Sequence, residues 1–438
     1  MAEKLRIKGS KTLKGEVNIS GAKNAVLKLM AAALLAKGES KIYNVPKLTD
    51  VTIMLNVLNQ LGAKTTYNSE QNYVTIDATD ITNITAKYEL VGKMRASFIV
   101  LGALIGRCKE AIVALPGGCA IGERRVDFHI KGLQALGANI KIENGYVHAK
   151  TTKLKGTDIY LDIPSVGATE NLMLASVLAE GSTRIQNAAQ EPEIVDLANF
   201  LNTMGADIIG AGTSEIIING VKQQNLHPIE YTTIPDRIEA GTYMAAIVAT
   251  KGKGIIRNVY PNHLTFFNSK LTQMGASIKL IEPNAIEVSC KTRLQPVNIV
   301  TQPYPGFPTD LQSLAIAILS TANGVSIVTE SLYENRFMQV PELCRMGADI
   351  HHERNHAIIT GVKKLTGAHI KASDLRAGAS LIIAALMADG YSEIENLHHI
   401  DRGYEDFESK FQKLGAEIVR YNDSIGFVSE KIVKGVNK

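Results

Sequence analysis

A short pattern that recurs six times constrains the fold of this chain more than any other feature. In each copy a helical stretch ends in Leu-Gly-Ala or Met-Gly-Ala, and successive glycines lie 68 to 75 residues apart. The six glycines are Gly62, Gly137, Gly205, Gly275, Gly347 and Gly415. This regular period is longer than that of the usual solenoid repeats, so each copy is predicted to be a small α/β unit. A feature that one copy has and the others lack is therefore a candidate for function.

The third copy gives the expected order of elements within a repeat. The sequence predicts a helix, a strand, a second helix and a hairpin over residues 165–178, 183–185, 193–204 and 208–218. A glycine follows each helix, because the residue after a helix commonly has a positive φ angle, which glycine adopts freely. We therefore interpret the triplets as structural. The predicted fold class is mixed α/β (α+β) with six βαβαββ-type repeats.

Length and composition indicate a globular protein of two domains. The chain has 438 residues, 45% of them hydrophobic and 21% charged, and six repeats divide most simply into two groups of three. The longest apolar run, residues 98–105, is too short to span a bilayer, and no apolar signal segment opens the sequence. Four widely spaced cysteines without a CxxC pair indicate free thiols in a reducing compartment. We expect a cytoplasmic protein that does not bind membranes.

The charge distribution points to an anionic small molecule as ligand. A net charge of +4 indicates local basic sites, and not the broad basic face of a nucleic-acid-binding protein. Lys23, Arg95 and Arg376 stand where the first helices of three repeats are predicted to begin. A cation there opposes the helix dipole and lowers stability unless an anion lies beside it, so binding is favoured for all three. Asp236, at another predicted start, is interpreted as a plain N-cap.

One loop distinguishes the second copy from the first. The segment from the strand after the first helix to the triplet glycine spans 26 positions in the second copy and 21 in the first. The additional positions fall within the loop of residues 116–125, which holds three glycines, Cys119 and the pair Arg124-Arg125. Glycines allow such a loop to close over a ligand, and nearby arginines favour the thiolate of Cys119. Cys119 is therefore the candidate reactive thiol, and Cys108, Cys290 and Cys344 are expected to be structural.

A zinc-protease motif also occurs, but its context argues against a metal site. Residues 352–356 read His-Glu-Arg-Asn-His, which binds zinc only on a helix, where positions i and i+4 share a face. This segment follows the triplet glycine Gly347 at the place where the other copies have a hairpin, so the histidines are predicted to fall on strand ends and a turn. We expect no metal site here, and His398-His399 is likewise expected at the surface or in a supporting role.

Further cations occupy corresponding turns in the last two copies. Arg336 lies in Glu-Asn-Arg, and Arg402 lies in Asp-Arg-Gly. Together with the cations already named, they predict a substrate with several negative charges, for which phosphate fits the arginine fork best. A Walker loop and a GxGxxG turn after a strand are both absent from the sequence, so an ordinary ATP or dinucleotide site is not expected.

Nine segments, taken in order, resemble the bacterial enolpyruvyl transferases that use UDP-N-acetylglucosamine, and the resemblance covers essentially the whole chain. The segments are Ser20-Gly21-Ala22-Lys23-Asn24-Ala25, Met94-Arg95-Ala96-Ser97, Pro116-Gly117-Gly118-Cys119, Ser165-Val166-Gly167-Ala168-Thr169, Glu191-Pro192-Glu193-Ile194-Val195-Asp196, Phe307-Pro308-Thr309-Asp310, Glu334-Asn335-Arg336-Phe337, Asp374-Leu375-Arg376-Ala377 and Asp401-Arg402-Gly403-Tyr404. No single segment decides the matter, but nine in the family order do.

The resemblance implies a fold and a reaction. The fold is a two-domain inside-out α/β barrel with three repeats in each domain, the first domain being 23–232 and the second 1–22 plus 233–438, with substrates in the cleft between them. In the reaction, the sugar 3′-hydroxyl attacks the central carbon of phosphoenolpyruvate and phosphate leaves. This is the first committed step of bacterial peptidoglycan precursor synthesis, and the implied small-molecule partners are phosphoenolpyruvate and UDP-N-acetylglucosamine. No metal or organic cofactor is implied.

Residue roles follow from the same resemblance. Cys119 matches the cysteine that gives a proton to the methylene carbon of phosphoenolpyruvate and reacts with the epoxide inhibitor fosfomycin, and Asp310 matches the carboxylate that takes the hydroxyl proton. Lys23 and Arg402 complete the implied catalytic set. The residues implied around phosphoenolpyruvate are Lys23, Asn24, Arg124, Arg336, Arg376 and Arg402. Those implied around the nucleotide sugar are Asn24, Arg95, Arg124, Arg125, Val126, Asp127, Phe128, Ser165, Val166, Gly167, Asp310 and Leu332.

Two departures and two alternatives accompany this interpretation. The family often has proline where this chain has Arg125 and Lys28, which bears on loop closure and inhibitor sensitivity but not on the reaction. The sibling transferases that act on shikimate 3-phosphate share fold and chemistry but lack the loop cysteine. RNA 3′-terminal phosphate cyclases use similar repeats, but the absence of a basic face and the presence of the Cys119 loop argue against them.

Overall fold

The computed structural model describes residues 3–117 and 126–422 of the chain. These residues form two compact units. The first unit comprises Ser20–Asp236 and Pro303–Gly306, and the second comprises the described parts of Met1–Ile19, Arg237–Gln302 and Phe307–Lys438. No helix in the described ranges combines the length and apolar composition needed to cross a bilayer.

Each unit carries three separate four-stranded sheets with one common topology. The first sheet of the first unit has the spatial order β14 (Glu230–Thr232), β3 (Glu39–Tyr43), β5 (Tyr73–Asp77), β4 (Lys64–Asn68). Its second sheet has the order β6 (Thr85–Ala86), β7 (Glu110–Ala114), β9 (Tyr146–Lys150), β8 (Asn139–Glu143). Its third sheet has the order β10 (Asp158–Tyr160), β11 (Ser182–Gln186), β13 (Glu215–Asn219), β12 (Asp207–Ile209). The first sheet of the second unit has the order β2 (Lys14–Asn18), β15 (Lys253–Arg257), β17 (Ala285–Ser289), β16 (Ser277–Glu282). Its second sheet has the order β18 (Ile299–Val300), β19 (Val325–Thr329), β21 (His356–Thr360), β20 (Asp349–Glu353). Its third sheet has the order β22 (His369–Lys371), β23 (Tyr391–Glu395), β1 (Glu3–Lys8), β24 (Glu417–Asn422). In every sheet the first two strands are parallel and the other pairs are antiparallel.

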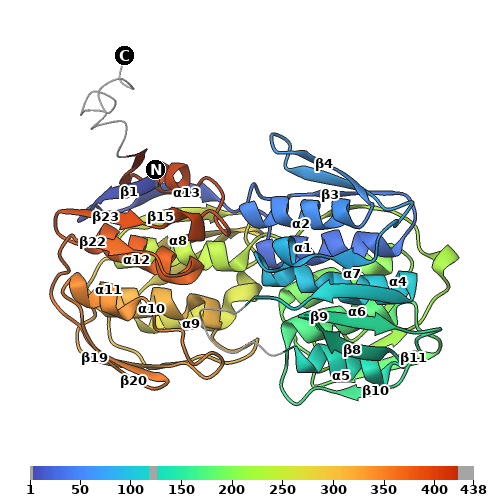
Figure 1. The fold of residues 1–438 in the computed structure, drawn as a ribbon. Helices are drawn as coiled ribbons and strands as arrows, with labels where there is room; N and C mark the ends of the chain where they lie inside the picture. Colours follow the sequence, from blue (N-terminus) through green and yellow to red (C-terminus); the bar gives the residue numbers. More distant parts are fainter. Residues whose placement is uncertain (1–2, 118–125, 423–438) are drawn as a thin grey trace. The chain divides into compact units, whose positions relative to one another are not determined.

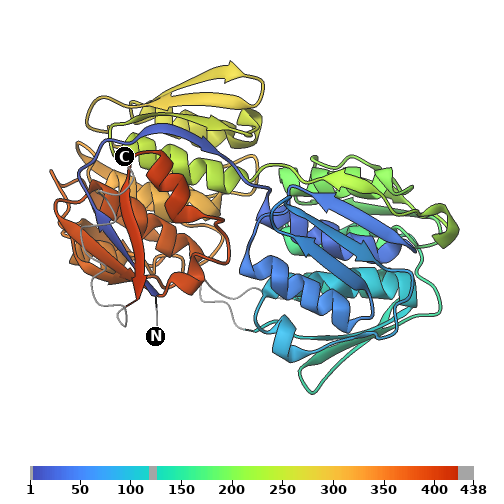
Figure 2. The ribbon, with the colours of Figure 1, turned by 90° about the horizontal axis from the view of Figure 1, so that it is seen from above.

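The start of the chain completes two sheets of the second unit. Strand β1 lies between β23 and β24, with Leu5 opposite Ile394 on one side and Arg420 on the other. It takes the place that the second hairpin strand has in the other sheets. Strand β2 pairs in parallel with β15. Figure 2 shows this blue N-terminal segment beside the red C-terminal strands of the same unit.

The first helix of each repeat is buried on nearly all sides. These core helices are α1 (Lys23–Ala32), α4 (Val100–Cys108) and α6 (Val166–Ser176) in the first unit, and α8 (Arg237–Ala249), α10 (Gln312–Leu319) and α12 (Leu375–Met387) in the second. Because they lie inside and the sheets lie outside, they lack an exposed polar face, and the charged side chains that they carry, such as Lys28 of α1 and Glu170 of α6, are buried as well. In the second unit, α8, α10 and α12 contact one another, as Figure 1 shows. The predicted α/β fold of six repeats with helices inside the sheets is confirmed.

The second helices of the repeats are partly exposed and end at the recurrent glycines. These helices are α2 (Thr49–Gln60), α5 (Asp127–Ala135), α7 (Pro192–Thr203), α9 (Thr265–Gln273), α11 (Val340–Arg345) and α13 (Phe407–Lys413), with a short α3 (Tyr88–Val91) besides. All six triplet glycines have positive φ angles, between 85° and 108°. The interpretation of the triplets as helix-terminating elements is confirmed.

Two predicted core-helix starts lie on 3-10 turns instead of α-helix. Arg95 opens η2 (Arg95–Ile99), which leads into α4, and Asp310 lies in η5 (Thr309–Leu311), which leads into α10. Such turns are frequent at helix N-termini, where the first N–H groups have no helical partner. The other 3-10 segments are η1 (Ala33–Leu35), η3 (Gln223–Asn225), η4 (Pro261–Leu264) and η6 (Leu397–His399).

Candidate active site

The second unit brings Asp310 together with two of the predicted arginines. Arg376, in the first turn of α12, places Nη2 2.8 Å from Asp310 Oδ2, and Arg336 places Nη2 2.5 Å from Oδ1. Both arginine side chains are 6% exposed, whereas that of Asp310 is 26% exposed. The carboxylate is therefore held from the protein side by two guanidiniums and keeps access to solvent.

These ion pairs set the protonation state of Asp310. Burial raises the pKa of its carboxyl, but the charges of Arg376 and Arg336 and their hydrogen bonds outweigh burial and hold that pKa well below the usual range. Asp310 is consequently ionised at neutral pH and can accept a proton.

Glu330 organises the turn next to this cluster. Its Oε1 accepts the backbone N–H groups of Leu332 (2.9 Å) and Tyr333 (3.2 Å), and its Oε2 accepts the hydroxyl of Thr309 (2.9 Å). Thr309 in turn accepts a hydrogen bond from Arg336 Nη1 at 2.8 Å. The sequence analysis missed Glu330, although an acidic residue directly after a strand and before a tight turn is the signal that could have found it.

In the first unit, the start of α1 is surrounded by carboxylates. Lys23 Nζ lies 2.8 Å from Asp50 Oδ2, and Asp50, in the first turn of α2, is only 1% exposed. Asp236, which was predicted to cap the helix that follows it, accepts the backbone N–H of Lys23 at 3.1 Å. Its carboxylate thus reaches the start of another core helix as well, because backbone hydrogen bonds join Ala22 to Ile234 and Ser20 to Asp236. Asp50 was not predicted, and only the tertiary contact reveals it.

The residues expected to contact a nucleotide sugar gather at the starts of the core helices of the same unit. The segment η2, which opens with Arg95, packs against both α1 and α6. Asn24 lies in the first turn of α1, and Ser165 caps α6 by accepting the N–H of Ala168 at 3.4 Å. Val166 and Gly167 follow in the first turn of that helix.

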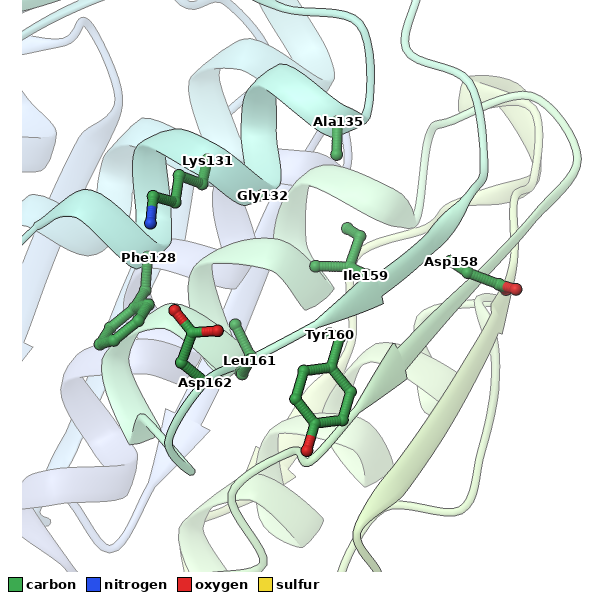
Figure 3. A pocket seen from close by; sticks show the side chains of 9 residues that line it. All are labelled: Phe128, Lys131, Gly132, Ala135, Asp158, Ile159, Tyr160, Leu161 and Asp162. Atoms are coloured by element: carbon green, nitrogen blue, oxygen red, sulfur yellow. The ribbon is translucent and has the colours of Figure 1, made fainter.

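A pocket of about 220 Å³ lies between helix α5 and strand β10 in the first unit. Phe128 and Lys131 of α5 line one side, and residues 158–162, from β10 and the turn after it, line the other. Figure 3 shows Phe128 and Lys131 extending from α5 toward Asp162. Phe128 was predicted as a nucleotide-sugar contact, with Val126 and Asp127 just before it. The strand side of the cavity was not predicted, because strand residues carry no distinctive motif.

Several predicted residues occupy other positions or lie outside the described ranges. Cys119, Arg124 and Arg125 fall outside the described residues. Arg402 follows Asp401, whose carboxylate is bound by both Nη atoms of Arg420 at 2.6 and 3.0 Å. The remaining predicted contact, Leu332, is partly exposed after the turn held by Glu330, and the other three cysteines are free thiols on or next to α4, β17 and α11.

The zinc-like motif lies on a hairpin, as predicted. Strand β20 ends at Glu353, Arg354 has a φ angle of 52° in the turn, and β21 begins at His356. Within residues 3–117 and 126–422, no group of three or more His, Cys, Asp or Glu side chains could hold a metal ion.

Comparison with known proteins identifies the family. The family model described as EPSP synthase (3-phosphoshikimate 1-carboxyvinyltransferase) matches residues 7–411. This chain belongs to the EPSP synthase family of enolpyruvyl transferases. Among similar proteins is UDP-N-acetylglucosamine 1-carboxyvinyltransferase 2 of Carboxydothermus hydrogenoformans, at 54% identity. Another is UDP-N-acetylglucosamine 1-carboxyvinyltransferase 1 of Staphylococcus aureus, at 52% identity. Each match covers 96% of this chain and 100% of the relative.

Solved structures agree with this assignment. The enolpyruvyl transferase NikO from Streptomyces tendae matches with a TM-score of 0.86 and 26% identity, covering 96% of this chain and 99% of that one. EPSP synthase from Acinetobacter baumannii shares the fold, with a TM-score of 0.73 at 19% identity over 96% of this chain and 100% of that one. The family assignment favours enolpyruvyl transfer over the phosphate-cyclase alternative.

Proposed function

We propose that this chain transfers the enolpyruvyl group of phosphoenolpyruvate to the 3′-hydroxyl of UDP-N-acetylglucosamine and releases phosphate. The observation that carries the proposal is the identity of 52–54% with carboxyvinyltransferases of that name over their whole length. We assign this reaction to the first committed step of peptidoglycan precursor synthesis, and the protein to the cytoplasm. We assign the two domains to residues 23–232 and to residues 1–22 plus 233–438.

Asp310 is the base in this proposal. The sugar oxygen forms a bond to the central carbon of phosphoenolpyruvate, its proton passes to Asp310, and Cys119 gives a proton to the methylene carbon. Phosphate then leaves the central carbon with the proton held by Asp310, and the Cys119 thiolate takes a proton from the new methyl group, which restores the double bond. Addition across a double bond needs this acid and this base at opposite ends, and Asp310 is ionised and partly exposed.

The arginine pair links substrate binding to the strength of this base. The two guanidiniums lower the pKa of Asp310 and so make it a weak base. When an anionic group of phosphoenolpyruvate binds Arg376, part of the positive charge beside Asp310 is neutralised, so the pKa of Asp310 rises. Proton acceptance is thereby favoured only once the substrate is present.

The remaining cations stabilise charge on phosphoenolpyruvate and its addition product. Lys23, Arg124 and Arg402, together with Arg376 and Arg336, are assigned to its phosphate and carboxylate, where negative charge must be held during addition. Asn24 stands beside Lys23 at the same helix start. We assign no metal or organic cofactor to the reaction, because two protein groups supply the acid and the base.

The nucleotide sugar is assigned to the first unit. Arg95, Ser165, Val166 and Gly167 present helix starts, whose backbone N–H groups and positive dipole ends suit phosphate oxygens. The cavity at Phe128 offers an aromatic wall for a flat base, next to the preceding Val126 and Asp127. Arg125 and Leu332 complete the set by resemblance.

A phosphate-release assay tests the function. Purified protein with phosphoenolpyruvate is expected to release phosphate with UDP-N-acetylglucosamine and not with shikimate 3-phosphate, and mass spectrometry of the nucleotide sugar should show the added enolpyruvyl group. Release with shikimate 3-phosphate alone would transfer the assignment to the sibling reaction. Release with neither acceptor would overturn the proposal.

A further inference from the structure

Two buried hydroxyl groups lie behind Arg376, on the side away from Asp310. Arg376 Nη1 donates a hydrogen bond to the hydroxyl of Tyr404 at 3.2 Å, while Nη2 of the same guanidinium binds Asp310. The Tyr404 hydroxyl lies 2.8 Å from Thr242 Oγ1. Tyr404 is 3% exposed and Thr242 is fully buried in α8. The Arg376 guanidinium therefore links these hydroxyls to Asp310.

The hydrogen bonds that connect Thr242, Tyr404 and Arg376 have a defined donor and acceptor at each step. Thr242 donates its only hydroxyl proton to the backbone carbonyl of Ile238 at 2.9 Å, so it must accept from Tyr404. Tyr404, having donated its proton, offers a lone pair to Arg376. Thr242, on core helix α8, thus orients the Tyr404 hydroxyl. That hydroxyl in turn orients the Arg376 guanidinium.

We propose that Tyr404, oriented by Thr242, is a positioning residue that holds the Arg376 guanidinium in the geometry needed for both Asp310 and the anionic substrate. The inference rests on the proposed function, because it assigns Arg376 to phosphoenolpyruvate. A long arginine side chain loses rotamer entropy when it is fixed, and a buried acceptor that fixes it beforehand removes that loss from the binding step. The Arg376 guanidinium carbon also lies 5.7 Å from the centroid of the Tyr404 ring, a cation–π contact that Tyr404→Phe keeps, so that variant tests the hydroxyl alone.

The ring of Tyr404 has a separate, packing role that a conservative variant preserves. Its centroid lies 4.8 Å from that of Phe407, which also packs against Phe411 at 4.8 Å. Tyr404→Phe keeps these contacts and removes only the hydroxyl. Tyr243 supplies a matched control, because its ring packs in the same cluster, 4.9 Å from Phe411, and its buried hydroxyl has no hydrogen-bond partner among the described residues.

The experiment compares steady-state kinetics and calorimetric binding for Tyr404→Phe, Thr242→Val, their double variant and Tyr243→Phe. Tyr404→Phe is expected to raise KM and Kd for phosphoenolpyruvate about tenfold, the usual effect of losing a hydrogen bond to a charged group. Binding of UDP-N-acetylglucosamine and the melting temperature should stay close to wild type. Thr242→Val should act in the same direction, and the double variant should be no worse than Tyr404→Phe alone, since both act through one contact. Tyr243→Phe should behave as wild type.

The outcomes separate this inference from the proposed function. A wild-type protein that binds phosphoenolpyruvate, combined with a Tyr404→Phe variant that binds it equally well, overturns the positioning role. Equal losses in both tyrosine variants would also overturn it, because they would indicate a packing effect. A wild type that neither binds phosphoenolpyruvate nor releases phosphate overturns the proposed function and this inference together.

Discussion

The buried ion pair between Lys28 and Glu170 makes the stability of this chain depend on pH in an unusual direction. Lys28 Nζ on α1 lies 3.1 Å from Glu170 Oε1 on α6 and donates to the carbonyl of Asn24 at 2.8 Å. Glu170 is fully buried, and its Oε2 has no hydrogen-bond partner among the described residues. Burial raises the pKa of the Glu170 carboxyl to about 7, since the opposing effect of Lys28 is smaller and Glu193 and Glu191 act in the same direction as burial.

The sign and size of the effect follow from linkage. The pKa of Glu170 is 4.5 in its ordinary state and about 7 in the folded chain, so folding favours the protonated carboxyl. The contribution of the Glu170 carboxyl to the free energy of unfolding is fully present below pH 4.5 and is lost as the pH rises toward 7. Each pKa unit corresponds to about 1.4 kcal/mol, so the loss across this range is about 3 kcal/mol.

Glu170→Gln isolates this contribution, because glutamine keeps the shape and cannot ionise. We expect the free energy of unfolding of the variant, relative to wild type, to rise by about 3 kcal/mol between pH 4.5 and pH 8, measured by urea unfolding at several pH values. Subtracting the two stability curves removes the pH dependence that other groups contribute equally to both proteins. One such group is Asp196, because burial raises its pKa to about 6.

An exposed glutamate gives a control of opposite sign. Glu180 forms a surface pair with Lys153 at 2.7 Å, and this hydrogen bond lowers the pKa of Glu180. Glu180→Gln should therefore lose a little stability relative to wild type as the pH rises. A Glu170→Gln difference that stays constant with pH, or that falls as the control does, would refute the reasoning, because the ion pair with Lys28 would then outweigh burial.

Three further predictions concern the site. Asp310→Ala should lower kcat at least about a thousandfold, with UDP-N-acetylglucosamine binding within a few-fold of wild type by calorimetry, because the base acts at the addition step; near-normal turnover would remove Asp310 from the mechanism. Replacing His352 and His356 together should change neither activity nor zinc content, and zinc lost only in that variant would contradict the hairpin assignment. Fosfomycin should label Cys119, faster with UDP-N-acetylglucosamine present, and peptide mass mapping that finds even labelling of all four cysteines would contradict an activated thiol.

The repeat made much of the fold predictable from the sequence. The period set the number of units, the glycines marked helix ends, and the third copy gave helices within a few residues of α6 and α7. The closure of the sheets could not be predicted in the same way. Residues 3–8 carry an ordinary strand pattern, and nothing local in it indicates that β1 belongs between strands almost 390 and 420 residues away. Pairing over such distances depends on the assembled core.

The sequence located the charged groups of the site but not their partners. Lys28 stood out as a departure from the family pattern, yet only the structure pairs it with Glu170, 142 residues away. Tyr404 lay inside a quoted motif, but its bond to Arg376 and Thr242 was not expected. Spacing along the chain reports which face of an element a residue occupies, and it does not report which two elements meet.

Two of the cations at helix starts have carboxylate partners in the protein that the sequence analysis did not predict. A lysine or arginine at a helix N-terminus does need a nearby anion, and the sequence suggested that the substrate supplies it. In this structure, carboxylates of the protein supply it: Asp50 pairs with Lys23, and Asp310 pairs with Arg376. In the proposed reaction, an incoming anion must compete with these carboxylates for the cations. At Arg376 an anion bound in this way would reduce the positive charge beside Asp310, so the same event that binds phosphoenolpyruvate would raise the pKa of the proposed base.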